Sequence, residues 1–243
     1  KINKTKLLVD YYFLFNQNIA SKLKKYIKFE SKLLGSFRNN KNPVNKKKIF
    51  KNSILFISQF RLQKVKNNKT GFNVENKLLF YLEDFCIRHK INLNIAGASS
   101  INKIFEKNYL LYNLRKKNKI NYYEKKTGNN SYNLVDKHDM IVFIDSTLGY
   151  EAIARKKKIA CFSSRKNINK IARPFGFPND KKFNNFYYSN YDTKDEVFRV
   201  LKNVFFTSNK NWSRYYFPEL KNLMSFNKNN ILLYKTIKKI LKN

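Results

Sequence analysis

The sequence contains little cysteine and no long apolar run. Cys86 and Cys161 are its only cysteines, and their separation fits neither a metal site nor a redox pair. Both stand in apolar settings, so we predict buried free thiols of a reducing compartment. No apolar stretch approaches the roughly 18–20 residues that span a bilayer, and no small-residue cleavage site follows the apolar patch in residues 1–18. We therefore expect neither a transmembrane helix nor a signal peptide.

Histidine is equally scarce, which limits the kinds of catalytic site. His89 closes a basic helix end, and His138 comes just before a strand, at the end opposite the expected cleft. No His, Cys and Asp cluster has metal spacing, and neither a glycine-rich P-loop nor a G-x-S-x-G elbow is present. We expect no bound metal, no cofactor and no catalytic histidine, and the catalytic residue stays unassigned.

Acidic residues are few. The sequence has 16 Asp and Glu but 51 Lys and Arg, which gives a formal net charge of +35. Lys, Asn, Ile, Tyr and Phe share A/T-rich codons, so genome composition explains much of this excess. A basic surface still attracts polyanions such as phosphorylated substrates, anionic lipid or nucleic acid. Because no familiar nucleic-acid-binding signature is present, we do not expect nucleic acid to be the partner.

Apolar, β-branched and aromatic runs alternate with helical patterns, which predicts an α/β fold with an open parallel sheet and helices on both faces. We expect residues 1–45 to form a partial N-terminal domain and linker, with the linker near residues 38–48. Residues 46–243 should form a Rossmann-like domain whose final helix can cross back to the N-terminal part. The expected strands are 10–16, 53–60, 91–100, 120–125, 140–146, 158–164 and 183–190, and residues 31–43 should be a strand tail followed by a connector. The expected helices are 19–27, 73–90, 101–117, 131–137, 147–156, 192–206 and 229–243.

The stretch DMIVFIDSTLGYEAIARKKKIACFSSR, residues 139–165, predicts a strand, a turn, a helix and a second strand. Its turn carries Ser146, Thr147 and Gly149. The first N–H groups of a helix lack internal partners and favour an anion, so this turn predicts a phosphate site. Helix capping by the two hydroxyls is the alternative. Gly149 costs roughly 1 kcal/mol inside a helix, which either a close ligand or tight packing on the sheet would offset.

Glu151 follows in the same helix and has two interpretations. It can stabilise the helix dipole from the first turn. It can also accept hydrogen bonds from sugar hydroxyls at the edge of the cleft, as acidic residues do in dinucleotide folds. The spacing alone leaves both open.

Two further strand ends should point at the same face. Ser58, Gln59 and Arg61 follow the first strand of the domain, and Gly97 and Ser99 follow the second. Ordinary loop chemistry explains either group by itself. Because ligands of open α/β sheets lie outside the carboxyl ends of the strands, the three ends together predict a phosphate-binding rim.

DSTLGYEAIARKKKIACFSSR, with FGFP following it, resembles the carboxyl-terminal half of surface carbohydrate biosynthesis proteins. These are GT-B-like glycosyltransferase relatives associated with O-antigen or capsule synthesis. VDYYFLFN and LLGSFRNN resemble the segment before the linker in that family. The resemblance implies two Rossmann-like domains facing across a cleft, with Ser146, Thr147 and Glu151 at the donor. Residues 1–45 are too few for a complete first domain of this kind.

The resemblance implies a glycosyltransferase that moves a sugar from a nucleotide-sugar donor to a glycan or lipid-linked acceptor. Helix dipoles and cations, rather than a metal, would then stabilise the departing diphosphate. We expect a cytoplasmic location at the inner face of the membrane. The alternatives are a polyol-phosphate transferase of the CDP-glycerol type, or a non-enzymatic basic module that binds nucleic acid or an anionic membrane.

Overall fold

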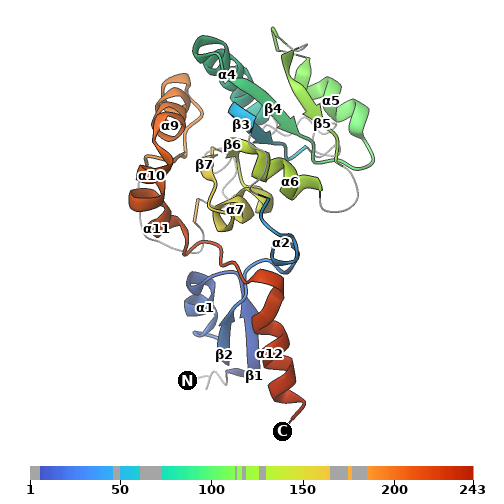
Figure 1. Cartoon of the computed structure of the whole chain (residues 1–243), viewed down its shortest axis with the longest axis vertical. Helices are drawn as coiled ribbons and strands as arrows, with labels where there is room; N and C mark the ends of the chain where they lie inside the picture. The colour runs from blue at the N-terminus through green and yellow to red at the C-terminus, as the bar shows by residue number, and fades with distance from the viewer. Residues whose placement is uncertain are drawn as a thin grey trace, which may run out of the picture.

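The large part of the molecule is built on a six-stranded parallel sheet of order β5-β4-β3-β6-β7-β8 (Figure 1). The computed structural model describes residues 6–45, 50–60, 73–112, 114–116, 119–125, 130–164, 175–176 and 185–242. This order is that of a doubly wound Rossmann sheet, which confirms the predicted fold class. The strands are β3 (Phe50–Ile57), β4 (Asn92–Ala96), β5 (Asn121–Tyr123), β6 (His138–Phe143), β7 (Lys158–Phe162) and β8 (Tyr188–Ser189).

Helices cover the sheet on both faces. In β3 the run Ser53–Ile57 is buried without interruption, and five of the six residues of β6 are buried too. Such continuous burial requires a layer on each side of a parallel sheet. Helices α4 and α9 pack against each other, and α6 packs against α7. The helices are α4 (Asn73–His89), α5 (Lys103–Leu111), α6 (Asn130–Lys137), α7 (Thr147–Ala154) and α9 (Lys194–Phe206).

Large aromatic and aliphatic side chains fill the core between these layers. Phe56, Phe85, Phe143 and Phe162 are fully buried. Removing the apolar surface of each side chain from water stabilises the fold by roughly 1.5–3 kcal/mol. Cys86 and Cys161 are buried free thiols, as predicted. After α9 the chain forms three short helical segments, α10 (Asn209–Asn211), η3 (Trp212–Tyr216) and α11 (Phe217–Leu220).

A small module lies below the large sheet in Figure 1. It comprises residues 6–37 and 226–242, and its two strands form a separate parallel sheet. Asn16 Nδ2 donates to Leu223 O at 2.7 Å, and Ser225 N donates to Phe15 O at 2.9 Å, so the returning chain is bonded to the end of the first strand. Its elements are β1 (Leu7–Leu14), α1 (Gln17–Leu23), β2 (Ile27–Leu33), η4 (Lys228–Asn230) and α12 (Ile231–Ile240).

The structure differs from the sequence prediction in three segments. Residues 27–33 form a complete strand, whereas only a strand tail was expected from residue 31. The segment 37–41 is a short helix, α2 (Phe37–Lys41), because Ser36 Oγ accepts a hydrogen bond from Asn39 N at 3.3 Å. Helix α5 ends at Leu111, six residues before its predicted end. Among the described residues, no helix is both long enough and apolar enough to cross a membrane.

Candidate functional site

The point where the winding of the sheet reverses lies between β3 and β6. Chain connections leave these neighbouring strands toward opposite edges of the sheet. In open α/β sheets, ligands bind outside the carboxyl ends of the strands at such a point. Gln59 follows β3, and its Oε1 accepts a hydrogen bond of 3.0 Å from the backbone N of Asp145, which follows β6. The fold therefore brings two of the predicted strand ends together.

Helix α7 begins at this point with its first N–H groups unpaired. Ser146 is the N-cap residue with an extended backbone, φ −71° and ψ 133°, but its side chain makes no capping hydrogen bond. The capping alternative is therefore wrong for Ser146. Thr147 is exposed. Within the described part of the chain, nothing accepts a hydrogen bond from the backbone N of Thr147 or Leu148.

Gly149 is required by packing. A Cβ at this position would lie 2.2 Å from Cγ of Phe143, on the strand that precedes the helix. The phenyl ring of Phe143 is fully buried and cannot move aside without opening the core. Of the two reasons that the sequence left open for this glycine, the close approach of helix to sheet is the one observed.

Glu151 does not lie in the first turn of α7, so the helix-dipole interpretation is wrong. Its side chain is buried among two hydroxyl groups. Ser36 Oγ donates to Oε1, and the phenol of Tyr132 donates to Oε2 at 3.1 Å. Burial raises the pKa of Glu151, although both hydrogen bonds act in the opposite direction. Because Ser36 belongs to the connection between the two sheets, Glu151 joins α7 to that connection.

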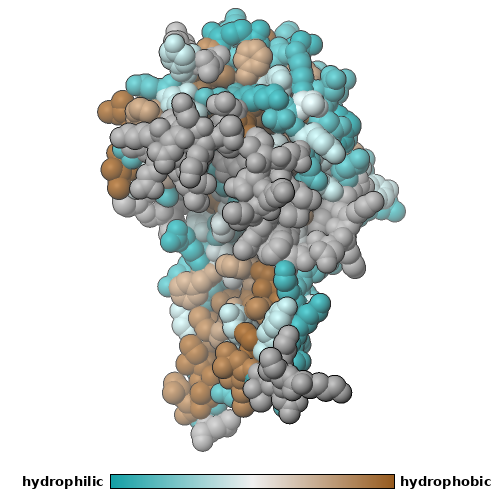
Figure 2. Space-filling model, turned by 180° about the vertical axis from the view of Figure 1, so that it is seen from behind, coloured by the Kyte–Doolittle hydropathy of each residue, from teal (hydrophilic) through white to brown (hydrophobic). Residues whose placement is uncertain are grey.

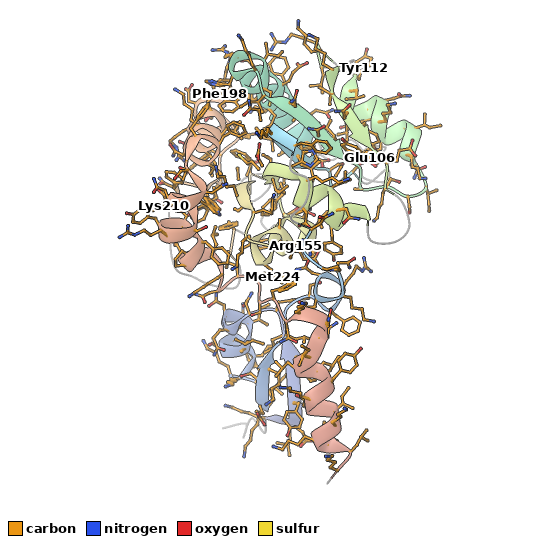
Figure 3. The ribbon with its side chains drawn as sticks, viewed as in Figure 1. Glu106, Tyr112, Arg155, Phe198, Lys210 and Met224 are labelled. Atoms are coloured by element: carbon orange, nitrogen blue, oxygen red, sulfur yellow. The ribbon has the colours of Figure 1, made fainter. Side chains whose placement is uncertain are left out.

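The strand ends after β3 and β4 are occupied by internal carboxylates. Glu106 of α5 accepts hydrogen bonds from the backbone N of Ala98 at 2.8 Å, from Ser99 N at 2.7 Å and from Ser58 Oγ at 2.6 Å. Figure 3 labels Glu106 beside these strand ends. Glu75 accepts a hydrogen bond from the backbone N of Gln59. Carboxylates already hold the N–H groups that the sequence prediction had assigned to phosphate.

Gly97 also has a packing explanation, since a Cβ there would lie 2.3 Å from the hydroxyl oxygen of Tyr122. Ser58 is buried, and the Oγ of Ser99 accepts a hydrogen bond from Asn102 N at 2.8 Å. Arg61 lies outside the described residues. The predicted rim thus has three ends in one place. The backbone N–H groups of Gln59, Ala98 and Ser99 are bonded to carboxylates, whereas those of Thr147 and Leu148 have no acceptor among the described residues.

Two residues outside the prediction complete the surroundings of α7. Arg155, just after the helix, forms an ion pair with Asp136 in which both side chains are at most 1% exposed. Its guanidinium also donates to the carbonyl oxygens of Asn42 and Pro43 at 3.1 and 3.0 Å. Figure 3 shows Arg155 where the large part of the molecule meets α2. The basic run after the helix was the only sequence signal for this contact, and it does not identify the partner.

The chain belongs to a family described as "putative O-antigen biosynthesis protein", which matches residues 1–241. This match confirms the predicted resemblance. No curated protein matches the sequence.

Several solved structures share the fold. Staphylococcus aureus MnaA with UDP is 14% identical over 96% of this chain and 61% of its own, with a TM-score of 0.61. UDP-GlcNAc 2-epimerase from Methanocaldococcus jannaschii, in complex with UDP-GlcNAc and UDP, is 14% identical over 95% and 61%, with a TM-score of 0.58. A Rickettsia africae glycosyltransferase is 17% identical over 100% and 65%, with a TM-score of 0.51.

These likenesses define a GT-B-like fold, which is shared by glycosyltransferases and UDP-GlcNAc 2-epimerases. Identities this low support the fold alone. The chain spans about three-fifths of the length of the first of these structures, 61% of MnaA.

Proposed function

We propose that this protein binds a nucleotide-activated sugar outside the carboxyl end of β6, with the diphosphate of the donor on the first turn of α7. Thr147 and Leu148 would supply backbone N–H donors, and the hydroxyls of Ser146 and Thr147 would add further hydrogen bonds. Gln59, held against the same turn, would lie at the border of the site. The proposal assigns Gly149, Gly97, Ser58 and Ser99 to the support of these loops, and Glu151 to the support of α7.

One observation favours the start of α7 over the other two strand ends. Three strand ends meet at the same edge of the sheet, and the backbone N–H groups after β3 and β4 are bonded to Glu75 and Glu106. A phosphate at those two ends would meet negative charge. The N–H groups of Thr147 and Leu148 have no such acceptor among the described residues, so an anion gains its hydrogen bonds there without displacing an internal one. The UDP in the MnaA structure and in the epimerase complex supports this ligand class.

We further propose that the bound donor gives its sugar to a glycan or lipid-linked acceptor. The family description, O-antigen biosynthesis, supports a step of polysaccharide assembly. The developing charge on the departing diphosphate would be stabilised by the amino end of α7, because a fixed dipole at that position needs no reorganisation. Such a reaction would proceed in the cytoplasm, at the inner face of the membrane.

The small module and the large α/β part are proposed to be the two domains of this arrangement, divided near residue 45. The two strands of the small module would then be part of a first domain facing the donor site. Helix α12 would belong to that first domain in space, although it follows the second in sequence.

Substituting Thr147 by proline tests the diphosphate site directly. Thr147 is the first residue of α7, where proline is favoured, and the extended backbone of Ser146 suits a residue before proline. The variant therefore removes one N–H donor while keeping the helix. A charge-assisted hydrogen bond contributes about 1.5–3 kcal/mol, so calorimetry should show UDP binding weakened about ten- to hundredfold. Thr147→Ala, which loses only the hydroxyl, is the matched control and should bind UDP more tightly than Thr147→Pro.

Two results would contradict the proposal: no heat of binding with UDP or another nucleoside diphosphate, or equal affinity in Thr147→Pro and the wild type. An epimerase is the second candidate, because one of the similar structures is a UDP-GlcNAc 2-epimerase and MnaA also binds UDP. Incubation with UDP-GlcNAc separates the two activities. Conversion to a second UDP-sugar without any acceptor would favour the epimerase, and acceptor-dependent release of UDP would favour the transferase.

A further inference from the structure

Large apolar side chains are exposed on the small module. In α12, Ile231, Tyr234 and Ile237 are 47%, 53% and 42% exposed, and Leu241, just after it, is 79% exposed. Leu7 and Leu8 of β1 add exposures of 64% and 70%. Figure 2 shows hydrophobic residues gathered over the lower part of the molecule, while the described surface above is mainly hydrophilic. A monomer rarely leaves such a patch without a partner.

A stripe that does not face the module is formed by Ile231, Tyr234, Ile237 and Leu241. They recur at intervals of three, three and four residues, which places them on one side of a helix. Thr236, on the opposite side, is only 5% exposed. In Figure 1, α12 runs alongside the two-stranded sheet. The helix thus packs with one side and leaves an apolar stripe, here called the α12 stripe, on another.

Lysines surround this surface and acids are almost missing from it. Residues 6–37 and 226–242 contain eleven Lys and two acids, Asp10 and Glu30, and Glu30 is already paired with Lys32. In α12 and just after it, Lys235, Lys238, Lys239 and Lys242 lie between the apolar positions. A helix with apolar residues on one side and lysines on another has the composition of a helix that lies in a membrane interface.

We propose that the small module docks on an anionic lipid surface through the α12 stripe and its lysines. An apolar patch can be covered by a second copy, by another protein or by lipid, and the positive charge around this patch distinguishes among them. A second copy would bring the same eleven lysines against these, which like-charge repulsion opposes. Protein interfaces are depleted of lysine, whereas anionic headgroups attract every lysine near the surface while the acyl region accepts the apolar side chains. The inference does not depend on the proposed donor site, which lies in the other part of the molecule.

Flotation of the full chain with vesicles tests this docking. Binding to phosphatidylcholine vesicles that contain phosphatidylglycerol should be strong at low salt and should fall as salt rises, and vesicles of phosphatidylcholine alone should bind weakly. Lys238→Gln with Lys242→Gln should weaken binding about thirtyfold, since each lysine near an anionic surface contributes about fivefold. Tyr234→Asp with Leu241→Asp should abolish it.

Ile104→Asp with Tyr112→Asp is the matched control. These side chains are 74% and 81% exposed, and Figure 3 shows Tyr112 at the far end of the molecule from α12. This variant makes the same change of charge and should bind vesicles like the wild type. Thr147→Pro should also bind vesicles normally, which separates a failure here from a failure of the donor site. All variants should keep the circular dichroism and unfolding midpoint of the wild type.

Three outcomes would overturn the inference. The first is no flotation with phosphatidylglycerol vesicles, and the second is an equal loss in the control and in the α12 variants. The third is a dimer in light scattering that Tyr234→Asp with Leu241→Asp converts to a monomer without vesicles. In that case a second copy, and not lipid, covers the α12 stripe.

Discussion

At the scale of single residues, internal contacts decide which backbone groups at the strand ends remain unpaired. The space that a methyl group on Gly149 would fill is taken by the ring of Phe143, and the N–H groups of Ala98 and Ser99 are taken by Glu106. Both contacts are made by residues of the same chain and not by a ligand. Among the described residues, the N–H groups of Thr147 and Leu148 in the first turn of α7 have no such partner.

Glu151 gives a pH-dependent prediction at the same scale. Burial raises its pKa, so the folded protein holds this proton at pH values where the unfolded chain has lost it. The contribution of Glu151 to the free energy of unfolding is therefore fully present below the ordinary glutamate pKa. It is lost as the pH rises through the raised pKa of the folded protein. In Glu151→Gln this part of the pH dependence should disappear, which urea unfolding across the pH range measures.

The control for that experiment is Glu30→Gln. The hydrogen bond with Lys32 lowers the pKa of Glu30, so its contribution has the opposite sign and is lost as the pH falls. A stability difference between Glu151→Gln and wild type that is constant with pH would contradict the assignment of a raised pKa to Glu151.

At the scale of one element, α7 joins two tasks. Its first turn follows the carboxyl end of β6, while Glu151 and the following Arg155 bind the connection at residues 36–43. A helix of eight residues is short enough for both ends to act on neighbouring structure. The orientation of the proposed diphosphate site therefore depends on the contacts at the other end of the same helix.

Arg155→Met tests that dependence. It leaves the carboxylate of Asp136 buried without its cation, and breaking a buried pair in this way costs about 3–5 kcal/mol. The double variant Arg155→Met with Asp136→Leu buries no unpaired charge and should cost far less than the sum of the two single changes. Urea unfolding measures all three variants, and strictly additive losses would show that the pair is not coupled.

At the scale of the whole molecule, buried asparagines tie the end of the chain to its beginning. Asn40 is 1% exposed, and its Nδ2 donates to Leu34 O at 2.8 Å and to Asn230 Oδ1 at 2.9 Å. Its Oδ1 accepts a hydrogen bond from Asn227 N at 2.9 Å. Asn230 has φ 55° and ψ 34°, a left-handed conformation that asparagine tolerates better than most residues. These bonds set where α12 begins.

Asn40→Leu should loosen this connection. It leaves buried donors and acceptors unpaired, which costs about 1–3 kcal/mol for each group. Hydrogen exchange should accelerate in the amides of α12 while those of β6 keep their protection, because β6 makes no contact with Asn40 in the described hydrogen bonds. Asn211→Leu, at an exposed position, is the control. Uniform acceleration over the chain would mean that Asn40 supports the whole fold and not this joint.

Most elements of the large sheet were predictable because each is specified by neighbouring residues. Buried parallel strands are continuous apolar runs, and the run before Asp145 can be recognised without knowing its neighbours. Only the tail of β2 was predicted, because IKFESKL mixes lysine and glutamate with apolar residues and becomes a strand only beside β1. Glu106 was missed because an acid near a helix start is ordinary, and only the returning loop at residues 98–99 makes it a ligand of backbone N–H groups.

The amino-acid order is enough to decide that this chain is an α/β protein with a turn of hydroxyls and glycine between a buried strand and a helix. Periodicity and turn chemistry act over a few residues, so they can be read locally. Which polar groups at that turn stay free could only be decided by folding. The partners of Glu106, Glu151 and Arg155 lie up to 116 positions away along the chain, and contacts over such separations arise from the packing of whole elements.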